Sequence, residues 1–402
     1  MSILASALKR VKPSPTIAVS SLAMELKAQG RDIISLGAGE PDFPTPANIA
    51  AAGIRAIEEG KTRYTAVDGI PELKKAICAK FKRENGLEYT PAQITVGTGG
   101  KQVLYNAFMA TLNPGDEVII PEPFYANYNG FAVMAGLKVV PVTSHIENGF
   151  ALPPVAQIEA KITAKTKAII ICNPGNPTGY LYAKEELEQL RDIVQKHDLF
   201  LFADEVYREF CYDGAKPFST MNLTCIEQNV VMIDSVSKRY SMCGARIGAL
   251  ISKNKEFMQA ALKFGQARLS PPTVDQIAAE AALDTPQSYF DEVVAEYVAR
   301  RNIMVDGLNS IPGVFCPKPS GAFYCVAKFP VENAEHFCQW LLEEFSFEGQ
   351  TVMMAPANGF YATPGAGLQE ARIAYVLNQT HLKAAVECLR VALEQYPGKL
   401  KD

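Results

Sequence analysis

One lysine follows the end of a predicted buried strand in a setting that suits imine chemistry. In the segment VVMIDSVSKRYSMCGARIG, Ser235, Ser237 and Lys238 come directly after the strand. Arg246 follows eight residues beyond the lysine, and hydroxyl and guanidinium groups both suit a phosphate dianion. A lysine near cationic groups and away from bulk water can lose its proton and become an imine-forming nucleophile. A lysine after a strand is commonly just solvated, but these neighbours favour a phosphate-bearing ligand beside a reactive amine.

Three further turns place polar residues after predicted strands. ITVGTGGKQVLYNAF carries Gly99 and Gly100 where a helix begins, and backbone N–H groups there can bind phosphate, although such turns often bind nothing. LFLFADEVY places Asp204 at a strand end, with Tyr207 three residues on. Asp204 is either a helix cap or the carboxylate that keeps a pyridine nitrogen protonated, so that a pyridoxal ring can act as an electron sink. Asn176, in CNPGNPTG, is explained equally well by turn chemistry.

The elements that must position these residues form a β–α alternation. Short apolar runs that are continuous rather than alternating in polarity are typical of strands buried on both faces of a sheet. Amphipathic stretches such as 183–198 lie between several of them and predict helices. In open α/β sheets, ligands bind outside the carboxyl ends of the strands, which is where the polar residues above are found. The predicted strands are 94–97, 117–121, 138–142, 167–172, 199–204, 230–234 and 247–252.

The two ends of the chain differ from this middle. Residues 1–45 combine a helical stretch with a Gly/Pro-rich turn, GAGEPDFPTP. Residues 296–402 begin in a long charged helix pattern and continue with two short strands and a final helix. We expect both ends to pack together as a smaller domain beside a large ligand-binding domain formed by residues 46–295.

Composition disfavours several classes of function. The 402 residues are 48% hydrophobic and 20% charged with a net charge of −4, which argues against nucleic acid or an anionic membrane as a partner. We find neither a secretory signal pattern nor a run of about 18 apolar residues. The nine cysteines are dispersed without a C-x-x-C pair, which indicates reduced thiols, and the four histidines lack zinc-site spacing. We therefore expect a cytoplasmic protein without a metal site.

Ordered motifs along most of the chain resemble the class I aminotransferases of the pyridoxal 5′-phosphate (PLP) fold type I. The resemblance is closest to the bacterial aspartate and aspartate/prephenate aminotransferase branch. It implies an α/β/α layered fold with a mostly parallel seven-stranded sheet and a smaller α+β domain from both chain ends. It also implies PLP as the cofactor and a homodimer with active sites at the subunit interface. The motifs include GAGEPDFPTP, GTGGKQVLYNAF, NPGNPTG, DEVY, SVSK, GARIG, PSGAFY and ARIAYVLN.

The resemblance implies roles around the cofactor, residue by residue. Lys238 resembles the lysine that holds PLP as a Schiff base and shuttles the substrate proton, and Asp204 resembles the partner of the ring nitrogen. Asn176 and Tyr207 resemble the residues that bind the 3-oxygen of the ring. Tyr125 stands where the branch usually stacks a tryptophan on the ring, and tyrosine can stack too. The remaining cofactor contacts, most of them to the phosphate, are expected from Gly99, Gly100, Lys101, Ser235, Arg246 and, across the subunit interface, Tyr64.

Substrate contacts are also implied by the resemblance. Arg372 resembles the arginine that binds the substrate α-carboxylate, with Gly39, Tyr125 and Asn176 around the same ligand. Lys101 stands where members with acidic substrates bind the distal carboxylate, although a lysine in the first turn of a helix can equally be exposed. The segment expected to close over that carboxylate contains Ser14 and Thr16, and Ala245 replaces a tryptophan that the branch usually has before Arg246.

The predicted activity is a PLP-dependent transamination between an L-amino acid, with aspartate favoured, and a 2-oxo acid, with 2-oxoglutarate favoured. Three alternatives stay open. The acceptor or donor can be prephenate or an aromatic compound, and the same fold also supports C–S β-lyases, against which Lys101 argues mildly. A PLP-sensing regulator without catalysis is disfavoured, because only roughly forty residues precede the predicted large domain and none form a basic recognition helix.

Overall fold

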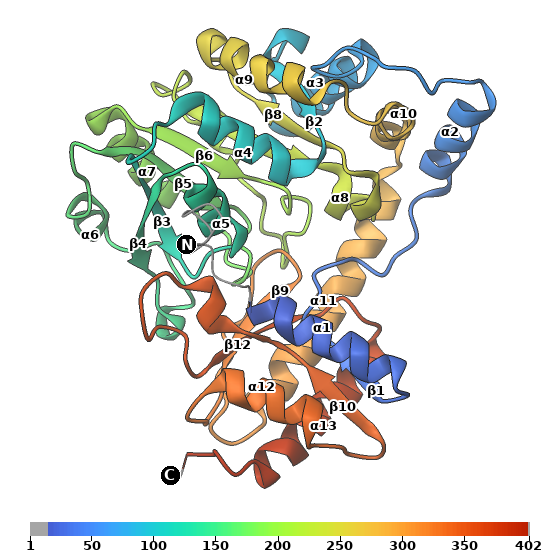
Figure 1. Cartoon of the computed structure of the whole chain (residues 1–402), viewed down its shortest axis with the longest axis vertical. Helices are drawn as coiled ribbons and strands as arrows, with labels where there is room; N and C mark the ends of the chain where they lie inside the picture. Colours follow the sequence, from blue (N-terminus) through green and yellow to red (C-terminus); the bar gives the residue numbers. More distant parts are fainter. Residues whose placement is uncertain (1–14, 401–402) are drawn as a thin grey trace, which may run out of the picture.

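The computed structural model describes residues 15–400 and is built around a seven-stranded sheet (Figure 1). The strand order is β2-β8-β7-β6-β5-β3-β4; β8 runs antiparallel to both of its neighbours, and the other neighbours pair in parallel. No helix within residues 15–400 is long and apolar enough to cross a membrane. The strands are β2 (Ile94–Gly97), β3 (Glu117–Glu122), β4 (Lys138–Thr143), β5 (Thr166–Cys172), β6 (Phe200–Asp204), β7 (Val230–Ser235) and β8 (Gly248–Ile251).

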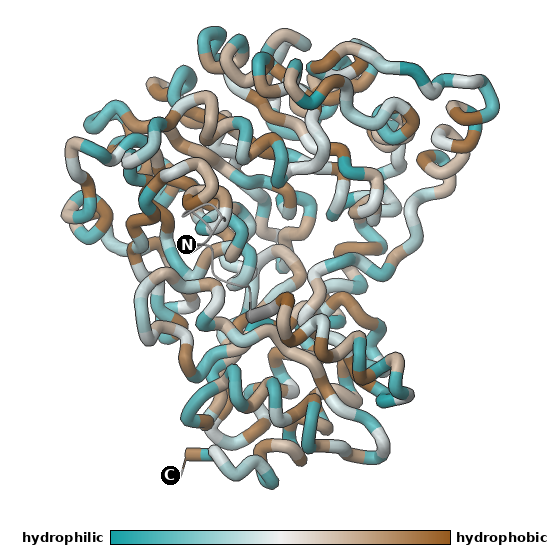
Figure 2. The backbone as a smooth tube through the Cα atoms, in the orientation of Figure 1, coloured by the Kyte–Doolittle hydropathy of each residue, from teal (hydrophilic) through white to brown (hydrophobic). Residues whose placement is uncertain are grey.

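The continuous apolar runs form these strands because both faces of the sheet are covered. Every residue of β2, β3, β7 and β8 is buried, and the strands share two hydrophobic clusters, one on each side. Hydrophobic residues dominate the strands, whereas the surrounding helices carry both kinds of residue along their turns (Figure 2). All seven strands predicted from the sequence are present, each with ends within one residue of the predicted ones.

The helices of this part of the chain show why amphipathic stretches pack on the sheet. α7 (Lys184–His197) buries Leu187, Leu190, Ile193 and Val194 along one face, and Glu186 caps its start through the N–H group of Ala183 at 2.7 Å. The others are α2 (Ala47–Glu58), α3 (Pro71–Asn85), α4 (Gly99–Thr111), α5 (Asn127–Met134), α6 (Val155–Glu159), α8 (Val236–Arg239), α9 (Lys255–Arg268) and α10 (Thr273–Ala281).

The two ends of the chain meet beside this sheet (Figure 1). β1 (Asp32–Ser35) pairs in parallel with β10 (Gln350–Met353), 318 positions further along the chain. β11 (Ala355–Pro356), β12 (Glu370–Ala374) and β9 (Tyr324–Lys328) form an antiparallel sheet in that order. The helices here are α1 (Pro15–Ala28), α11 (Gln287–Asn309), α12 (Ala334–Glu343) and α13 (Gln379–Gln395).

The predicted domain boundaries stay predictions. The boundary between residues 295 and 296 falls inside α11, which is a continuous helix that carries buried residues on both sides of that point. A long helix that packs against both parts of the chain has no linker composition, so hydrophobic patterning alone offers no signal for where one domain ends.

Candidate active site

A cavity of about 570 Å³ opens at the carboxyl ends of β5, β6 and β7. These three strands are parallel, so their ends reach the same edge of the sheet, and Cys172 at the end of β5 lies opposite Asp204 at the end of β6. Eleven of the residues predicted from the sequence line this cavity, namely Gly39, Gly100, Lys101, Tyr125, Asn176, Asp204, Tyr207, Ser235, Lys238, Arg246 and Arg372.

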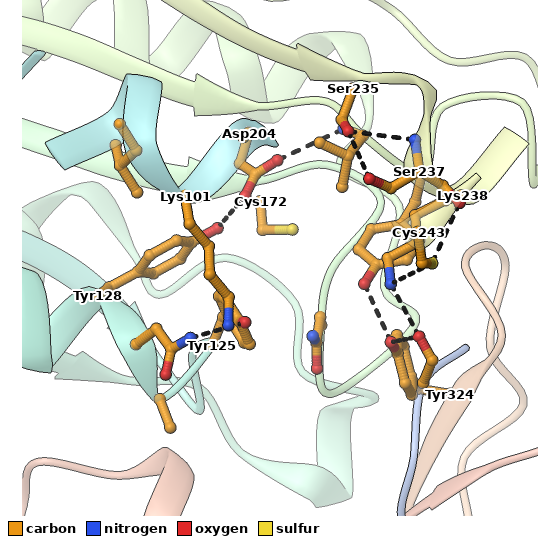
Figure 3. A pocket seen from close by; sticks show the side chains of 18 of the residues that line it. Lys101, Tyr125, Tyr128, Cys172, Asp204, Ser235, Ser237, Lys238, Cys243 and Tyr324 are labelled. Atoms are coloured by element: carbon orange, nitrogen blue, oxygen red, sulfur yellow. Dashed lines mark hydrogen bonds between the residues drawn. The ribbon is translucent and has the colours of Figure 1, made fainter. Parts of the chain in front are cut away.

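Lys238 is held in the cavity by a short helix that begins directly after β7. Ser235 caps α8, because its hydroxyl accepts the N–H group of Ser237 at 3.1 Å and donates to the carbonyl of Ile247 at 2.9 Å. The amine of Lys238 donates to the carbonyl oxygen of Gly39 at 2.8 Å and lies 3.7 Å from the sulfur of Cys243 (Figure 3). The nucleophile proposed from the sequence therefore projects toward the N-terminal segment that carries Gly39.

A buried group of charged side chains anchors α8 through Arg239. Arg239, next to the lysine, pairs with Asp234 and lies 3.1 Å from Glu209, which in turn lies 2.7 Å from the amine of Lys80. Burial raises the pKa of Glu209, but Arg239 and Lys80 outweigh burial and lower this pKa to about 2. Because each buried charge has a partner, the loop around Lys238 is anchored without an unpaired ion.

Asp204 is a buried carboxylate without a cationic partner. The hydroxyl of Tyr128 donates to Oδ2 at 2.7 Å, and the N–H group of Val206 lies 3.4 Å from Oδ1 (Figure 3). No lysine or arginine in the described part of the chain forms an ion pair with it. Burial therefore raises the pKa of Asp204 to about 6, against the opposing effect of Tyr128. Such a carboxylate suits a ligand that brings its own positive N–H group.

The start of α4 and the β7–β8 connection form an anion cradle. Gly99 has a φ of 81° at the first position of α4, and a side chain there would overlap the guanidinium of Arg246. Gly248 packs directly on the backbone of Gly99 and Gly100, where an added Cβ would also overlap. A Cβ added at Gly100 would lie 3.9 Å from Cβ of Ser235, so the two residues are close neighbours. Helix N–H groups, a hydroxyl and a guanidinium thus converge on one small space, which is the donor set that a phosphate requires.

Arg372, in β12, presents a donor to the opposite side of the cavity. Nη1 donates to the side-chain oxygen of Asn176 at 3.1 Å, and Nη2 donates to the carbonyl of Gly37. Nε is buried and has no hydrogen-bond partner in the protein. The guanidinium carbon lies 4.9 Å from the ring centroid of Phe360 and 4.8 Å from that of Tyr324. A carboxylate ligand would supply the missing acceptor.

Lys101 and Tyr125 line a third wall. The amine of Lys101 lies 5.7 Å from the ring centroid of Tyr125, whose hydroxyl accepts a hydrogen bond from the amide of Asn127 at 2.8 Å (Figure 3). Burial lowers the pKa of Lys101, and the positive charges of Arg246 and Lys238 lower it further. An anionic ligand bound nearby would stabilise the charged form of Lys101 against this repulsion.

Several predicted residues are not brought to the cavity wall. Gly99 lies behind Arg246 rather than in the lining, and Tyr64 is 82% exposed, away from the cavity of its own chain. Ser14 lies outside the described residues, and Thr16 belongs to α1 but its side chain is not among those described.

The cavity also contains residues to which sequence reasoning gave no role. Among them are Tyr128, Tyr324, Cys172, Cys243 and Asn127. Tyr324 belongs to the PSGAFY motif and Tyr128 follows Tyr125 by three positions, but their hydroxyls reach partners 117 and 76 positions away. Spacing along the chain gives no signal for contacts of that range.

Replacing Gly39 with alanine is expected to lower the melting temperature and the activity. The added methyl group would overlap the hydroxyl and ring of Tyr324, and overpacking of a filled site typically costs about 1–3 kcal/mol. Thermal unfolding and steady-state rates measure both effects. Gly130→Ala, at a helical position with nothing within 4 Å of the added group, is the matched control and is expected to be neutral. An unchanged Gly39→Ala protein would contradict the close packing.

Comparisons with known proteins agree with this geometry. Residues 31–389 match the family model described as aminotransferase class I and II. The chain is 44% identical over 395 residues to an aspartate/prephenate aminotransferase of Cereibacter sphaeroides, with 92% of this chain and 97% of that relative covered. It is 38% identical to an aspartate aminotransferase of Bacillus subtilis, with 98% and 99% covered.

Among solved structures, an aspartate aminotransferase of Thermus thermophilus with maleate has a TM-score of 0.89 and 35% identity, with 98% of this chain and all of that chain covered. The aspartate aminotransferase of Rhizobium meliloti also has a TM-score of 0.89, at 34% identity. These matches confirm the predicted fold and the predicted transaminase activity. A match that extends over nearly the whole chain, together with a cavity lined by the expected side chains, shows that this chain belongs to the class I and II aminotransferase family.

Proposed function

We propose that this aminotransferase uses PLP and exchanges an amino group between L-aspartate and a 2-oxo acid, with 2-oxoglutarate as the favoured acceptor. The observation that carries the proposal is the arrangement of three features in one cavity. They are a buried carboxylate without a cation, Asp204; a lysine amine, Lys238; and the anion cradle at the start of α4.

The cavity residues fit PLP in charge and in hydrogen-bonding capacity. The cradle of Gly100, Ser235 and Arg246 would hold the phosphate, and Asp204 would keep the ring nitrogen protonated. Asn176 and Tyr207 would hydrogen-bond the 3-oxygen of the ring, and Tyr125 would lie against its face. When bound, PLP supplies a protonated aromatic ring that takes up electron density from the substrate carbon.

Lys238 and Arg372 would act on the substrate itself. Arg372 would bind the α-carboxylate, because its Nε has no partner in the protein and Asn176 orients the guanidinium. Nζ of Lys238 would take the proton from the substrate Cα and hold it for return to the product. Gly39 aligns the two groups, because its carbonyl already fixes Nζ and its missing side chain leaves room beside Tyr324.

A dicarboxylic substrate is favoured by the third wall of the cavity. Lys101 supplies a positive charge away from Arg372. Its pKa is lowered by burial and by the positive charges of Arg246 and Lys238, which an anionic ligand would offset. A related enzyme was solved with maleate, a dicarboxylate. The relative from Cereibacter sphaeroides is named for both aspartate and prephenate, which makes prephenate the second candidate acceptor.

Substituting methionine for Lys101 is expected to raise the KM for aspartate about 10- to 100-fold, with little change for alanine as donor. A hydrogen bond to a charged group contributes about 1.5–3 kcal/mol, and alanine has no distal carboxylate to lose it. Steady-state kinetics with both donors measure the difference. Lys184→Met, at the first turn of α7 with a side chain 55% exposed, is the matched control. Equal losses for both donors would argue against this role for Lys101.

We also propose a homodimer in which Tyr64 reaches the phosphate bound by the other subunit. The segment from residue 54 to 64 supports an interface, because Ile54, Ile57 and Tyr64 are 58%, 60% and 82% exposed. The predicted cytoplasmic location, by contrast, stays a prediction.

Mixing two variants that are each expected to be inactive at limiting PLP tests the shared site. Tyr64→Ala is expected to weaken PLP binding about 10- to 100-fold, because a hydrogen bond to a charged group is lost. In a mixed dimer with Lys238→Ala subunits, one site would contain both intact residues, so activity at limiting PLP should return. Light scattering would establish the dimer, and failure of the mixed dimers to recover activity would contradict the sharing of Tyr64.

The assay that tests the proposed function combines purified protein, PLP, aspartate and 2-oxoglutarate. We expect oxaloacetate and glutamate in equal amounts, and a parallel assay with prephenate tests the second acceptor. Release of pyruvate and a thiol from cystathionine, without transamination, would instead indicate a C–S β-lyase. A protein that binds PLP but turns over no substrate would indicate a regulator.

A further inference from the structure

We infer that Tyr324 is a positioning residue of this active site, whose hydroxyl orients Tyr207 and whose ring braces Arg372. The inference rests on the proposed function, since it concerns the residues assigned there to cofactor and substrate. Tyr324 is the first residue of β9, is 2% exposed and lines the cavity. It connects the antiparallel sheet to the residues at the carboxyl ends of the large sheet.

The hydroxyl of Tyr324 lies in a chain of polar contacts that ends at the reactive lysine. It is 3.0 Å from the hydroxyl of Tyr207 and 3.5 Å from the carbonyl oxygen of Gly39. The amine of Lys238 donates to the same carbonyl at 2.8 Å, so Tyr324 and Lys238 share one acceptor (Figure 3). No other hydrogen bond among the described residues links the hydroxyl of Tyr207 to the segment that carries Gly39.

Counting protons fixes the direction of these bonds when a ligand is present. Tyr207 and Tyr324 each have one hydroxyl proton. If Tyr207 donates its proton to the ring oxygen of PLP, Tyr324 must be the donor in the hydrogen bond between the two tyrosines. The carbonyl of Gly39 then receives no proton from Tyr324. A tyrosine that accepts a hydrogen bond is also a stronger donor, so Tyr324 would strengthen the contact that Tyr207 makes.

The surroundings of Tyr207 agree with a donor role. Burial raises the pKa of Tyr207 well above its ordinary value, and the neighbouring Tyr324 raises it further. Tyr207 therefore keeps its proton throughout the working pH range. Its ring also meets that of Tyr324 edge to face, with centroids 5.6 Å apart, which limits how far either hydroxyl can turn.

The ring of Tyr324 has a separate contact. The guanidinium of Arg372 lies 4.8 Å from its centroid and 4.9 Å from the centroid of the Phe360 ring. The ring also fills the space beside Gly39. The hydroxyl faces Tyr207 and the ring faces Arg372, so substitutions can separate the two contacts. Phenylalanine at position 324 removes only the hydroxyl contact with Tyr207, whereas leucine removes the ring contact with Arg372 as well.

The experiment compares Tyr324→Phe, Tyr324→Leu and wild-type protein loaded with PLP. For Tyr324→Phe we expect kcat to fall about 3- to 10-fold with KM for aspartate within about 2-fold. The pH midpoint of the visible absorption of bound PLP should rise by about half to one pH unit, because a weaker donor stabilises the negative ring oxygen less. Tyr324→Leu should in addition raise KM, since Arg372 loses its aromatic support.

Tyr375→Phe is the matched control. Tyr375 is a buried tyrosine whose hydroxyl donates to the carbonyl of Ala322 at 3.3 Å, and it does not line the cavity. The inference would be overturned if Tyr324→Phe changed kcat and the pH midpoint of the PLP absorption no more than Tyr375→Phe does, each relative to wild type. The absorption midpoint belongs to folded, PLP-loaded protein only, so reduced stability of a variant cannot imitate it. A wild-type protein that neither binds PLP nor transaminates would overturn the proposed function, and this inference with it.

Discussion

Replacing Lys238 with alanine is expected to lower kcat for transamination by at least about 10⁴-fold, the largest effect of any single change in this cavity. The amine is the one lysine nitrogen that the fold directs to the carbonyl of Gly39, between the anion cradle and Arg372. No other base in the cavity lining can replace it, because the carboxylate of Asp204 already accepts a hydrogen bond from Tyr128. Single-turnover formation of oxo acid from enzyme loaded with PLP measures the loss.

Two comparisons separate the reactivity of the amine from its charge. Lys238→Arg keeps a positive charge, but a guanidinium is not deprotonated in proteins, so this variant should be as inactive as the alanine variant. Lys101→Ala removes a positive charge from the same cavity and should retain most of kcat while KM rises. The three proteins should unfold at similar temperatures, because neither lysine belongs to the buried ion group around Arg239. Turnover by Lys238→Ala above a hundredth of the wild-type rate would refute the assignment.

The fold could be predicted from the sequence because its signals are local. Runs buried on both faces, such as 230–234, need only their own residues to identify them, and the polar residues at their ends mark the edge where ligands bind. Lys238 and Asp204 can be identified in this way, since Asp204 ends such a strand and Lys238 follows another within four residues. Their roles, like those of Asn176 and Arg372, required the family resemblance.

The contacts that were not predicted are made between distant parts of the chain. Tyr128 reaches Asp204 across 76 positions, and Tyr324 reaches Tyr207 across 117. Neither tyrosine differs in its local pattern from a core aromatic residue, so only the packing of the two sheets reveals that its hydroxyl faces the cavity. Tyr64 illustrates the opposite case, because it is 82% exposed in its own chain and would gain its proposed role only from a second subunit.

Asp204→Asn is expected to lower kcat/KM about 10³-fold and, at the same time, to stabilise the cofactor-free protein. Asparagine keeps the shape of the side chain and can still accept the hydrogen bond from Tyr128, but it carries no charge to hold a ring nitrogen protonated. The activity loss is therefore electrostatic. Steady-state rates at saturating PLP, with bound PLP quantified, separate it from weaker cofactor binding.

The stability gain follows from the raised pKa of Asp204, which burial moves from 3.8 to about 6. The folded protein binds this proton more tightly than the unfolded chain, so the contribution of Asp204 to the free energy of unfolding is present below about pH 4 and is lost as pH rises through about 6. The difference corresponds to roughly 3 kcal/mol. Asp204→Asn should thus exceed wild type by about 1–3 kcal/mol in urea unfolding at pH 8, keep about half of this advantage near pH 5 and lose it below about pH 4.

Asp234→Asn is the control of opposite sign. Asp234 lies on the neighbouring strand, but it pairs with the buried Arg239, so its substitution leaves a cation without that partner. Removing one member of a buried ion pair typically costs about 3–5 kcal/mol, and this loss should persist at pH 8. A cofactor-free Asp204→Asn protein that is less stable than wild type at pH 8 would contradict the view that burial of the charged Asp204 carboxylate destabilises the fold. A gain would mean that the fold keeps a destabilising carboxylate at a position where only a bound cation can satisfy it, as expected of an active site that sacrifices stability for catalysis.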